Sequence, residues 1–301
     1  MAVTGNPPTP RSRMRPSQPN KTSPILTVVV TLCLGAAALG ASPSVPRGKM
    51  VERQCKGTRY FLYVPQSLPN KQSVRAKLLV LVHGRSLNPR EYAGRWVDAA
   101  EAKRVVFVAP LFDVETFPNY NRLNIMGVRA DLRLLEILDD VAAVCPVDTK
   151  KFYMYGHSAG GQFAHRFALV HPERIARGVA SAAGNYTFPD PNVRYHYGIG
   201  PCPGTEKIAL DVGKFVGLSF AVVVGGKDNT PDPSAGGTDA QGLSRLERGR
   251  NFFLAMKTYA KAHELPCRLS FHVIPGVGHS SSGTTPFAKQ YLLRYRSQGR
   301  R

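Results

Sequence analysis

Short apolar runs recur along the chain, separated by longer stretches in which apolar and polar residues mix. Runs of this length, rich in Val, Leu, Phe and Tyr, favour buried strands. Their alternation with amphipathic segments predicts the α/β class, with a mostly parallel central sheet flanked by helices. A chain of 301 residues that is 43% hydrophobic is long enough for one large domain of this kind. The seven runs are RYFLYVP, LLVLVHG, VVFVAP, FYMYG, GVASAAG, AVVVGG and LSFHVIP.

Four of the intervening stretches have the spacing of amphipathic helices. The predicted helices are 91–103, 129–144, 158–170 and 244–263. In the second helix, the expected buried stripe consists of Leu132, Leu135, Ile137 and Leu138.

The segment 152–168 carries the clearest chemical motif. A strand-like run enters the sequence GHSAGG at 156–161, and a helical pattern follows it. A sharp turn from strand to helix holds a serine hydroxyl clear of its surroundings, where a base can reach it. Gly156 and Gly160 lack the Cβ that would collide in so tight a turn. The segment therefore predicts a nucleophile elbow with Ser158 as the nucleophile.

An acid and a histidine follow the serine in the chain order that such hydrolases use. Asp228 comes soon after the apolar run 218–224, and His279 ends the loop PGVGH that follows another strand-like run. The carboxyl ends of parallel strands gather functional residues at one edge of a sheet. We therefore predict a catalytic triad of Ser158, Asp228 and His279.

Two alternatives concern the acidic loop. Asp232 lies in the same loop as Asp228 and is the alternative acid. Asp228, Asp232 and Asp239 could instead form a calcium loop, although their spacing matches no EF-hand, and we predict no metal. Among the other histidines, His157 is interpreted as scaffolding of the elbow and His272 as a packed residue of a strand.

The oxyanion hole is predicted to combine two backbone N–H groups. The first belongs to Ala159, directly after the nucleophile. The second comes from the loop that follows the apolar run 77–82 and begins with HGRS. Gly84 allows an abrupt turn there, and we expect Arg85 to supply the N–H. A plain turn at the end of a strand is the alternative for this loop.

The first 41 residues differ from the rest of the chain. Residues 1–24 are rich in Pro, Ser and Arg without any acid, and 25–41 is an uncharged apolar run. This is typical of a secretory signal, with cleavage after Gly40 or Ala41. An uncleaved membrane anchor is the alternative. We expect a secreted or periplasmic protein that consists of a signal at 1–41, a linker at 42–52 and a catalytic domain at 53–297.

The net charge of +20 is mostly a property of the expected mature part, because the first 41 residues hold four basic residues and no acidic one, which leaves +16. This charge would attract the protein to anionic surfaces. A generally Arg-rich composition is the alternative. The basic residues are scattered and are not interleaved with aromatic ones on one element, so we expect no nucleic-acid partner.

Four cysteines remain after removal of the signal: Cys55, Cys145, Cys202 and Cys267. An even number in an exported protein permits two disulfides, and three pairings are open. The sequence contains no paired C-x-x-C motif, so structural zinc is not expected.

Several segments together resemble the exported α/β hydrolases related to poly(3-hydroxybutyrate) depolymerases and feruloyl esterases. They are GTRY with the following VP at 57–65, HG at 83–84, GHSAGG at 156–161 and PGVGH at 275–279. The resemblance covers about residues 50 to 295. It implies the α/β-hydrolase fold and a serine esterase without a cofactor, acting on a small or polymeric ester. The loop after Asp228 lacks the Asp-x-x-Val-Pro continuation common in the depolymerases, which leaves the substrate open.

A segment at about 185–215 follows a strand end and is predicted to cap the site. We expect Tyr186 and Phe188 in it to bind substrate, with ordinary loop packing as the alternative. Two other functions remain open: a noncatalytic binding protein of the same fold, and a serine peptidase or acyltransferase. The sequence does not indicate an oligomeric state.

Overall fold

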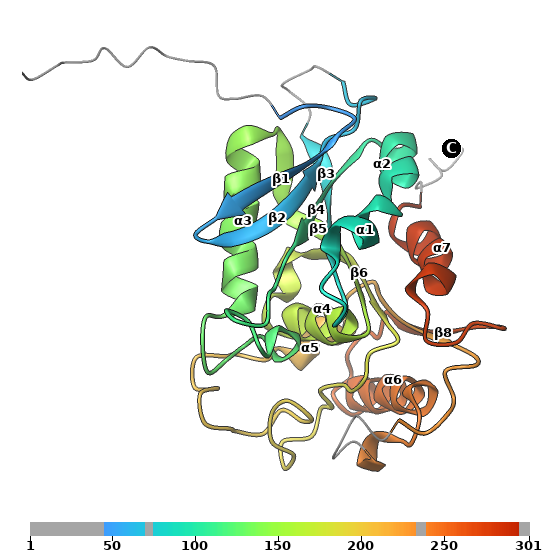
Figure 1. The fold of residues 1–301 in the computed structure, drawn as a ribbon. Helices are drawn as coiled ribbons and strands as arrows, with labels where there is room; N and C mark the ends of the chain where they lie inside the picture. Colours follow the sequence, from blue (N-terminus) through green and yellow to red (C-terminus); the bar gives the residue numbers. More distant parts are fainter. Residues whose placement is uncertain (1–44, 70–74, 233–238, 295–301) are drawn as a thin grey trace, which may run out of the picture. The chain divides into compact units, whose positions relative to one another are not determined.

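The computed structural model describes residues 45–69, 75–232 and 239–294, all of which belong to the compact unit 41–301 (Figure 1). The expected signal at 1–41 lies outside the described residues. The first strand begins at Met50, so it takes in the last three residues of the segment 42–52 that the sequence suggested as a linker.

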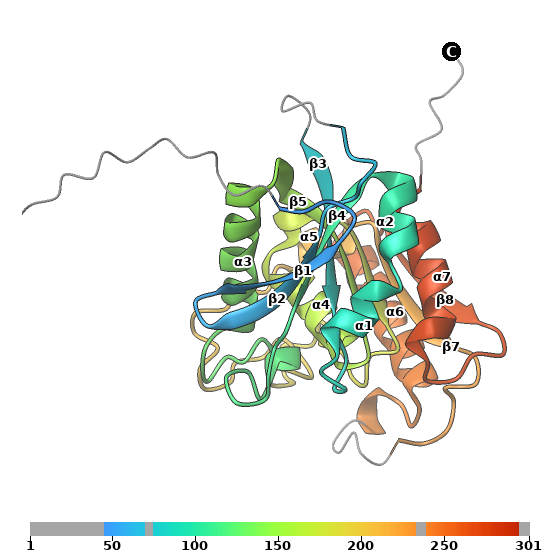
Figure 2. The ribbon, with the colours of Figure 1, turned by 45° about the horizontal axis from the view of Figure 1, so that its top comes forward.

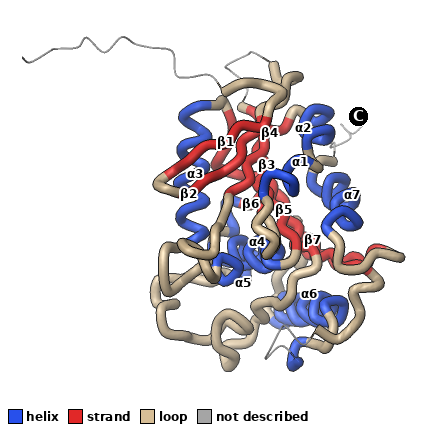
Figure 3. The backbone as a smooth tube through the Cα atoms, viewed as in Figure 1, coloured by secondary structure: helices blue, strands red, loops and turns tan. Residues whose placement is uncertain are grey.

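The unit is built on one eight-stranded sheet with the order β1-β2-β4-β3-β5-β6-β7-β8 (Figure 3). Strand β2 runs antiparallel to both β1 and β4. In the rest of the sheet, β4-β3-β5-β6-β7-β8, neighbouring strands are parallel. The strands are β1 Met50–Cys55, β2 Thr58–Tyr63, β3 Ala76–Val82, β4 Val105–Pro110, β5 Val147–His157, β6 Ile175–Ser181, β7 Phe220–Gly225 and β8 Leu269–Ile274.

Helices cover both faces of the sheet. One apolar cluster joins the sheet to α3, α4, α5 and α6, and a second joins it to α1, α2 and α7. Figure 2 shows α3 on one side of the sheet and α2 with α7 on the other. The helices are α1 Pro89–Gly94, α2 Val97–Lys103, α3 Ala130–Val144, α4 Ala159–Val170, α5 Val212–Val216, α6 Arg245–Ala262 and α7 Ser281–Leu292. The described residues also include the 3-10 turns η1 Tyr120–Arg122, η2 Pro172–Arg174 and η4 Asp239–Gln241.

The α/β class and the mostly parallel sheet predicted from the sequence are confirmed, and each of the seven apolar runs overlaps a strand. Strand β1 was not predicted, because its partly exposed sequence MVERQC has too few apolar residues to be recognised. Helices α5 and α7 were also missed. The predicted helix 91–103 is two helices, α1 and α2, and the buried Trp96 between them packs its ring against Tyr155 at 5.1 Å between centroids.

The predicted stripe of the α3 helix is wrong at one position. Leu132 is 46% exposed, whereas Ile137 and Leu138 are buried. The buried face also contains Leu134 and Val141, at the i, i+3 or i+4 spacing that one helix side requires. Leu132 lies off that side.

The parallel register brings five strand ends to one edge of the sheet. Val82 of β3 pairs with Gly156 of β5, which pairs with Ala180 of β6. On the other flank, Gly225 of β7 pairs with Ile274 of β8. Loops that leave these ends therefore start close together, although they are far apart in the sequence.

Candidate active site

Ser158 sits in a strained turn between β5 and α4. Its backbone has φ 56° and ψ −118°, a region that residues with a side chain rarely adopt. A Cβ on Gly156 would lie 2.0 Å from the carbonyl oxygen of Gly160, and a Cβ on Gly160 would lie 2.2 Å from that of Val82. Only glycine fits at these two positions, so the GHSAGG sequence is what permits the turn to close.

The structure brings the three predicted triad residues into one hydrogen-bonded chain. His279 Nε2 lies 3.1 Å from Ser158 Oγ, and His279 Nδ1 lies 2.8 Å from Asp228 Oδ2. Asp228 is 4% exposed, and the side chain of His279 is 34% exposed. A carboxylate only accepts, so Nδ1 carries the proton and Nε2 offers its lone pair to the serine hydroxyl. This is the arrangement that a general base needs.

The alternative acid is engaged elsewhere. Asp232 Oδ2 lies 2.5 Å from Arg245 Nη2 and 3.6 Å from Arg248 Nη1. Arg245 also places Nη1 3.4 Å from Asp228 Oδ1, so it holds the oxygen of Asp228 that His279 does not use. Sequence reasoning missed Arg245, because only the fold brings the start of α6 against the β7 loop. Within 45–69, 75–232 and 239–294, no group of three His, Cys, Asp or Glu could hold a metal ion.

The two expected oxyanion donors flank the serine. Ala159 is the first residue of α4, so the helix does not use its N–H. The loop after β3 lies against the elbow, since a Cβ on Gly84 would be 3.4 Å from the carbonyl oxygen of His157. Arg85, Ser158 and Ala159 line one cavity of about 140 Å³.

His83 fixes the loop that carries Arg85. Its Nε2 accepts from the N–H of Phe112 at 3.1 Å, so Nδ1 carries the proton and donates to the carbonyl oxygen of Gly84 at 2.7 Å. The Tyr120 hydroxyl donates to the carbonyl oxygen of His83 at 2.8 Å. Burial lowers the pKa of His83 to about 4, so the ring is neutral at pH 7. This supporting role was not predicted from the sequence.

A neutral buried histidine predicts a loss of stability in acid. The pKa of His83 is below the unfolded value of about 6.5, so between these two values the unfolded chain binds a proton that the folded chain does not. Stability therefore falls as the pH falls from about 6.5 to about 4, by about 1.4 kcal/mol per pH unit for each such histidine. His157 adds to this effect, because burial and then the charge of His279 lower its pKa to about 3.

We expect His83→Gln to reduce this acid sensitivity. Between pH 7.5 and 4.5, the free energy of unfolding should fall by about 2 kcal/mol less in the variant than in the wild type. Urea unfolding at the two pH values measures it. His263→Gln, at an exposed position, is the control and should keep the wild-type slope. Equal slopes in all three proteins would contradict a buried, neutral His83.

The structure corrects the predicted substrate-binding aromatics. Tyr186 is fully buried, with its ring stacked on Phe252 at 4.6 Å and against His165 at 5.2 Å. Phe188 packs edge-on against Phe252 at 5.8 Å. Tyr186 therefore belongs to the core, and the partly buried Phe188 packs against it. Neither is among the described residues that line the cavity beside Ser158. Besides Arg85, Ser158 and Ala159, these are Asn121, Arg122, Gln162, Gly184, Asn185, Tyr197, Asp232 and Arg245.

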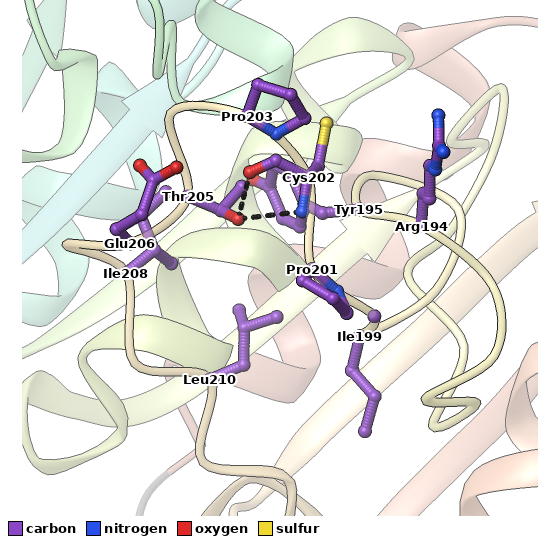
Figure 4. Close-up of a pocket in the computed structure, with 11 residues that line it drawn as sticks. Arg194, Tyr195, Ile199, Pro201, Cys202, Pro203, Thr205, Glu206, Ile208 and Leu210 are labelled. Atoms are coloured by element: carbon purple, nitrogen blue, oxygen red, sulfur yellow. Dashed lines mark hydrogen bonds between the residues drawn. The ribbon is translucent and has the colours of Figure 1, made fainter.

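A second hollow, of about 600 Å³, lies within the expected cap (Figure 4). All of its described lining residues come from the segment 194–210. The Thr205 hydroxyl accepts from the N–H of Cys202 at 3.1 Å and donates to the carbonyl oxygen of Cys202 at 2.5 Å, which closes the turn that forms one wall. Ser158 does not line this hollow.

The cysteines are unpaired in the structure. Cys55, Cys145, Cys202 and Cys267 are all free thiols, so none of the three pairings left open by the sequence is formed. Cys145 is buried, and burial raises the pKa of its thiol to about 11.

Within the described ranges, no helix has both the length and the apolar character needed to span a membrane.

Comparisons with known proteins agree with this geometry. The profile of the α/β-hydrolase fold family matches residues 77–213. No match is found among curated proteins. A structure of poly(aspartic acid) hydrolase-1 from Sphingomonas sp. is similar, with a TM-score of 0.71, 22% identity, and coverage of 83% of this chain and 100% of the other.

Two further solved structures have the same fold. The poly(3-hydroxybutyrate) depolymerase from Bordetella parapertussis gives a TM-score of 0.69 and 23% identity, over 81% of this chain and 90% of that one. A ferulic acid esterase gives a TM-score of 0.51 and 17% identity, over 81% of this chain and 96% of that one. The sheet, the elbow and the edge that gathers the strand-end loops define the α/β-hydrolase fold. The chain has the α/β-hydrolase fold and is related in structure to the group that contains this depolymerase and this esterase.

Proposed function

We propose that the protein is a serine hydrolase that cleaves carboxylic esters through an acyl-enzyme on Ser158. The observation that carries the proposal is the continuous chain from Ser158 Oγ through His279 to Asp228, at 3.1 and 2.8 Å. A noncatalytic binding protein has no use for a strained serine aligned with a base and a buried acid.

The geometry supports the following steps. His279 Nε2 takes the proton of Ser158 as Oγ attacks the ester carbonyl carbon, and Asp228 stabilises the charged imidazole. The N–H groups of Ala159 and Arg85 stabilise the oxyanion of the tetrahedral intermediate. The alcohol leaves with the proton from His279. Water, deprotonated by the same nitrogen, then attacks the acyl-enzyme and releases the acid and free Ser158.

The test combines covalent labelling with an ester series. A fluorophosphonate probe should label the wild type at Ser158, as located by peptide mass spectrometry. 4-Nitrophenyl esters from acetate to decanoate should be hydrolysed, and 4-nitroanilides of the same acids should be cleaved far more slowly. Comparable cleavage of the anilides would favour a peptidase instead. Absence of both labelling and turnover would favour the binding-protein alternative.

We also propose that the protein is exported, on the basis of the apolar run that follows a basic, acid-free segment in the first 41 residues. The mass of the protein recovered from the extracytoplasmic fraction tests this. Loss of the first 40 or 41 residues is expected. An intact N-terminus in a membrane fraction would favour the anchor.

A further inference from the structure

The cavity beside Ser158 is organised around a buried arginine. Arg166 of α4 has no exposed surface, and it donates to Asn185 Oδ1 at 2.6 Å and to Gln162 Oε1 at 3.3 Å. It also donates to the carbonyl oxygen of Asn121 at 2.7 Å. All three acceptors line the cavity. Arg166 therefore supports three residues of the cavity wall from the protein interior.

This arrangement fixes the orientation of two amide side chains. A guanidinium group only donates, so the amide oxygens of Asn185 and Gln162 must face Arg166. Their NH2 groups are then on the side of each amide away from Arg166, and both residues line the cavity. Arg85 and Arg122 line the same cavity.

The charge around the cavity is unbalanced. The hydrogen-bond acceptors of Arg166 are the neutral groups of Asn121, Gln162, Asn185, Thr187 and His196, and no carboxylate pairs with it in the described ranges. Burial lowers its pKa only to about 10, so it is charged at pH 7. Three further arginines, Arg85, Arg122 and Arg245, line the cavity, and Asp232, which pairs with Arg245, is the one carboxylate among its described lining residues.

Arg122 lines this cavity and also a second one of about 180 Å³. Its Nε is buried and has no hydrogen-bond partner among the described residues. A buried donor without an acceptor costs free energy, and an incoming anion would remove that cost. An apolar acyl chain in the same space would instead leave these donors desolvated and unpaired.

We propose, on the basis of the hydrolase function proposed above, that this cavity binds a carboxylate of the substrate, so that the preferred esters carry a free carboxylate close to the scissile bond. A carboxylate fits a cavity of about 140 Å³ and matches the planar fork of a guanidinium. It also supplies a negative charge, which neither Arg166 nor the Nε of Arg122 meets among the described residues. The substrate class is thus the half-esters of dicarboxylic acids or the anionic units of a polymeric ester.

Paired esters that differ in one charge test this inference. 4-Nitrophenyl hydrogen glutarate carries the carboxylate on the acyl side, and 4-nitrophenyl methyl glutarate is its neutral counterpart. 3-Carboxy-4-nitrophenyl butyrate and 4-nitrophenyl butyrate place the same difference on the alcohol side. Each kcat/KM is divided by the hydroxide-catalysed rate constant of that ester, so intrinsic reactivity cancels. The wild type should prefer the anionic member of at least one pair by about tenfold or more, which is the effect of one charge-assisted hydrogen bond.

The preference should fall by about tenfold in Arg122→Gln. Arg85→Gln, which keeps the backbone N–H, is a second variant that should reduce it. Arg250→Gln is the matched control, because Arg250 is exposed on α6 and does not line the cavity. It should keep the wild-type ratio. Circular dichroism and thermal unfolding verify that each variant is folded.

The outcomes separate this inference from the proposed function. Hydrolysis of the neutral esters without preference for either anionic one overturns the carboxylate site and leaves the esterase intact. A preference that persists in both Arg122→Gln and Arg85→Gln also overturns it, since another part of the protein would then recognise the charge. If no ester is hydrolysed and the fluorophosphonate probe does not label Ser158, the proposed function fails and the carboxylate site fails with it.

Discussion

Replacing Ser158 by alanine is expected to lower kcat for 4-nitrophenyl butyrate by on the order of a million-fold. The reason is that Oγ, 3.1 Å from His279 Nε2, is the atom that forms the acyl-enzyme. Adding His279→Ala to the Ser158→Ala variant should lower the rate little further, because the two residues act as a unit. Initial rates at saturating ester, corrected for the spontaneous reaction, measure both effects. Additive losses would show that the two side chains do not share one step.

The acid provides a sharper version of the same test. Asp228→Asn keeps the shape of the side chain, but it removes the charge next to His279 Nδ1, and kcat should fall about 10⁴-fold. Asp232→Asn is the matched control four residues away, and its effect should stay below about tenfold because its carboxylate pairs with Arg245. A larger loss in Asp232→Asn than in Asp228→Asn would make Asp232 the catalytic acid.

Replacing Gly160 by alanine is expected to prevent or severely weaken folding. Its Cβ would lie 2.2 Å from the carbonyl oxygen of Val82 and 2.6 Å from that of His83, and both are backbone atoms that no rotamer change can move. The start of α4 and the end of β3 would have to separate, at a cost of about 3 kcal/mol or more. Soluble yield and urea unfolding monitored by circular dichroism measure the loss.

The control for this substitution is Gly94→Ala. Gly94 ends α1, its φ is not positive, and a Cβ there would meet no atom within 4 Å. Alanine favours the helix over glycine by up to about 1 kcal/mol, so this variant should be as stable as the wild type or slightly more stable. If Gly160→Ala unfolds at the same urea concentration as Gly94→Ala, the elbow is not as tightly packed as the structure has it.

The local motif could be recognised in the sequence because its chemistry is contiguous. The GHSAGG segment contains the serine and the glycines that its turn requires, and all of them lie within six residues. Asp228 and His279 were predicted as partners because each follows an apolar run, and such runs end at a common edge. The exposed Leu132 shows the limit of this reasoning. It was assigned to the buried stripe of the predicted helix 129–144, but the fold buries only one side of that helix, and Leu132 lies off it.

The surroundings of the serine were not predictable in the same way. The sequence suggested Tyr186 and Phe188 for substrate contact, because aromatic side chains in a loop are available for binding when nothing covers them. In the fold, Phe252 of α6 packs against both rings, and the cavity is lined by polar groups from several separate segments. His83 likewise supports the loop that carries Arg85, through a hydrogen bond with the N–H of Phe112, 29 residues later in the chain.

By itself, the sequence determined the α/β class, the order along the chain of the seven strands that have apolar runs, and the chain order of the serine, the acid and the histidine. Periodicity, apolar runs and glycine requirements are local properties, and local properties can be read along a chain. Tertiary structure decided which residues surround the serine and gave the cavity its excess of donors and positive charge. Those features depend on contacts such as that of Arg166 with Asn121, 45 residues apart, which form only when the sheet has brought the segments together.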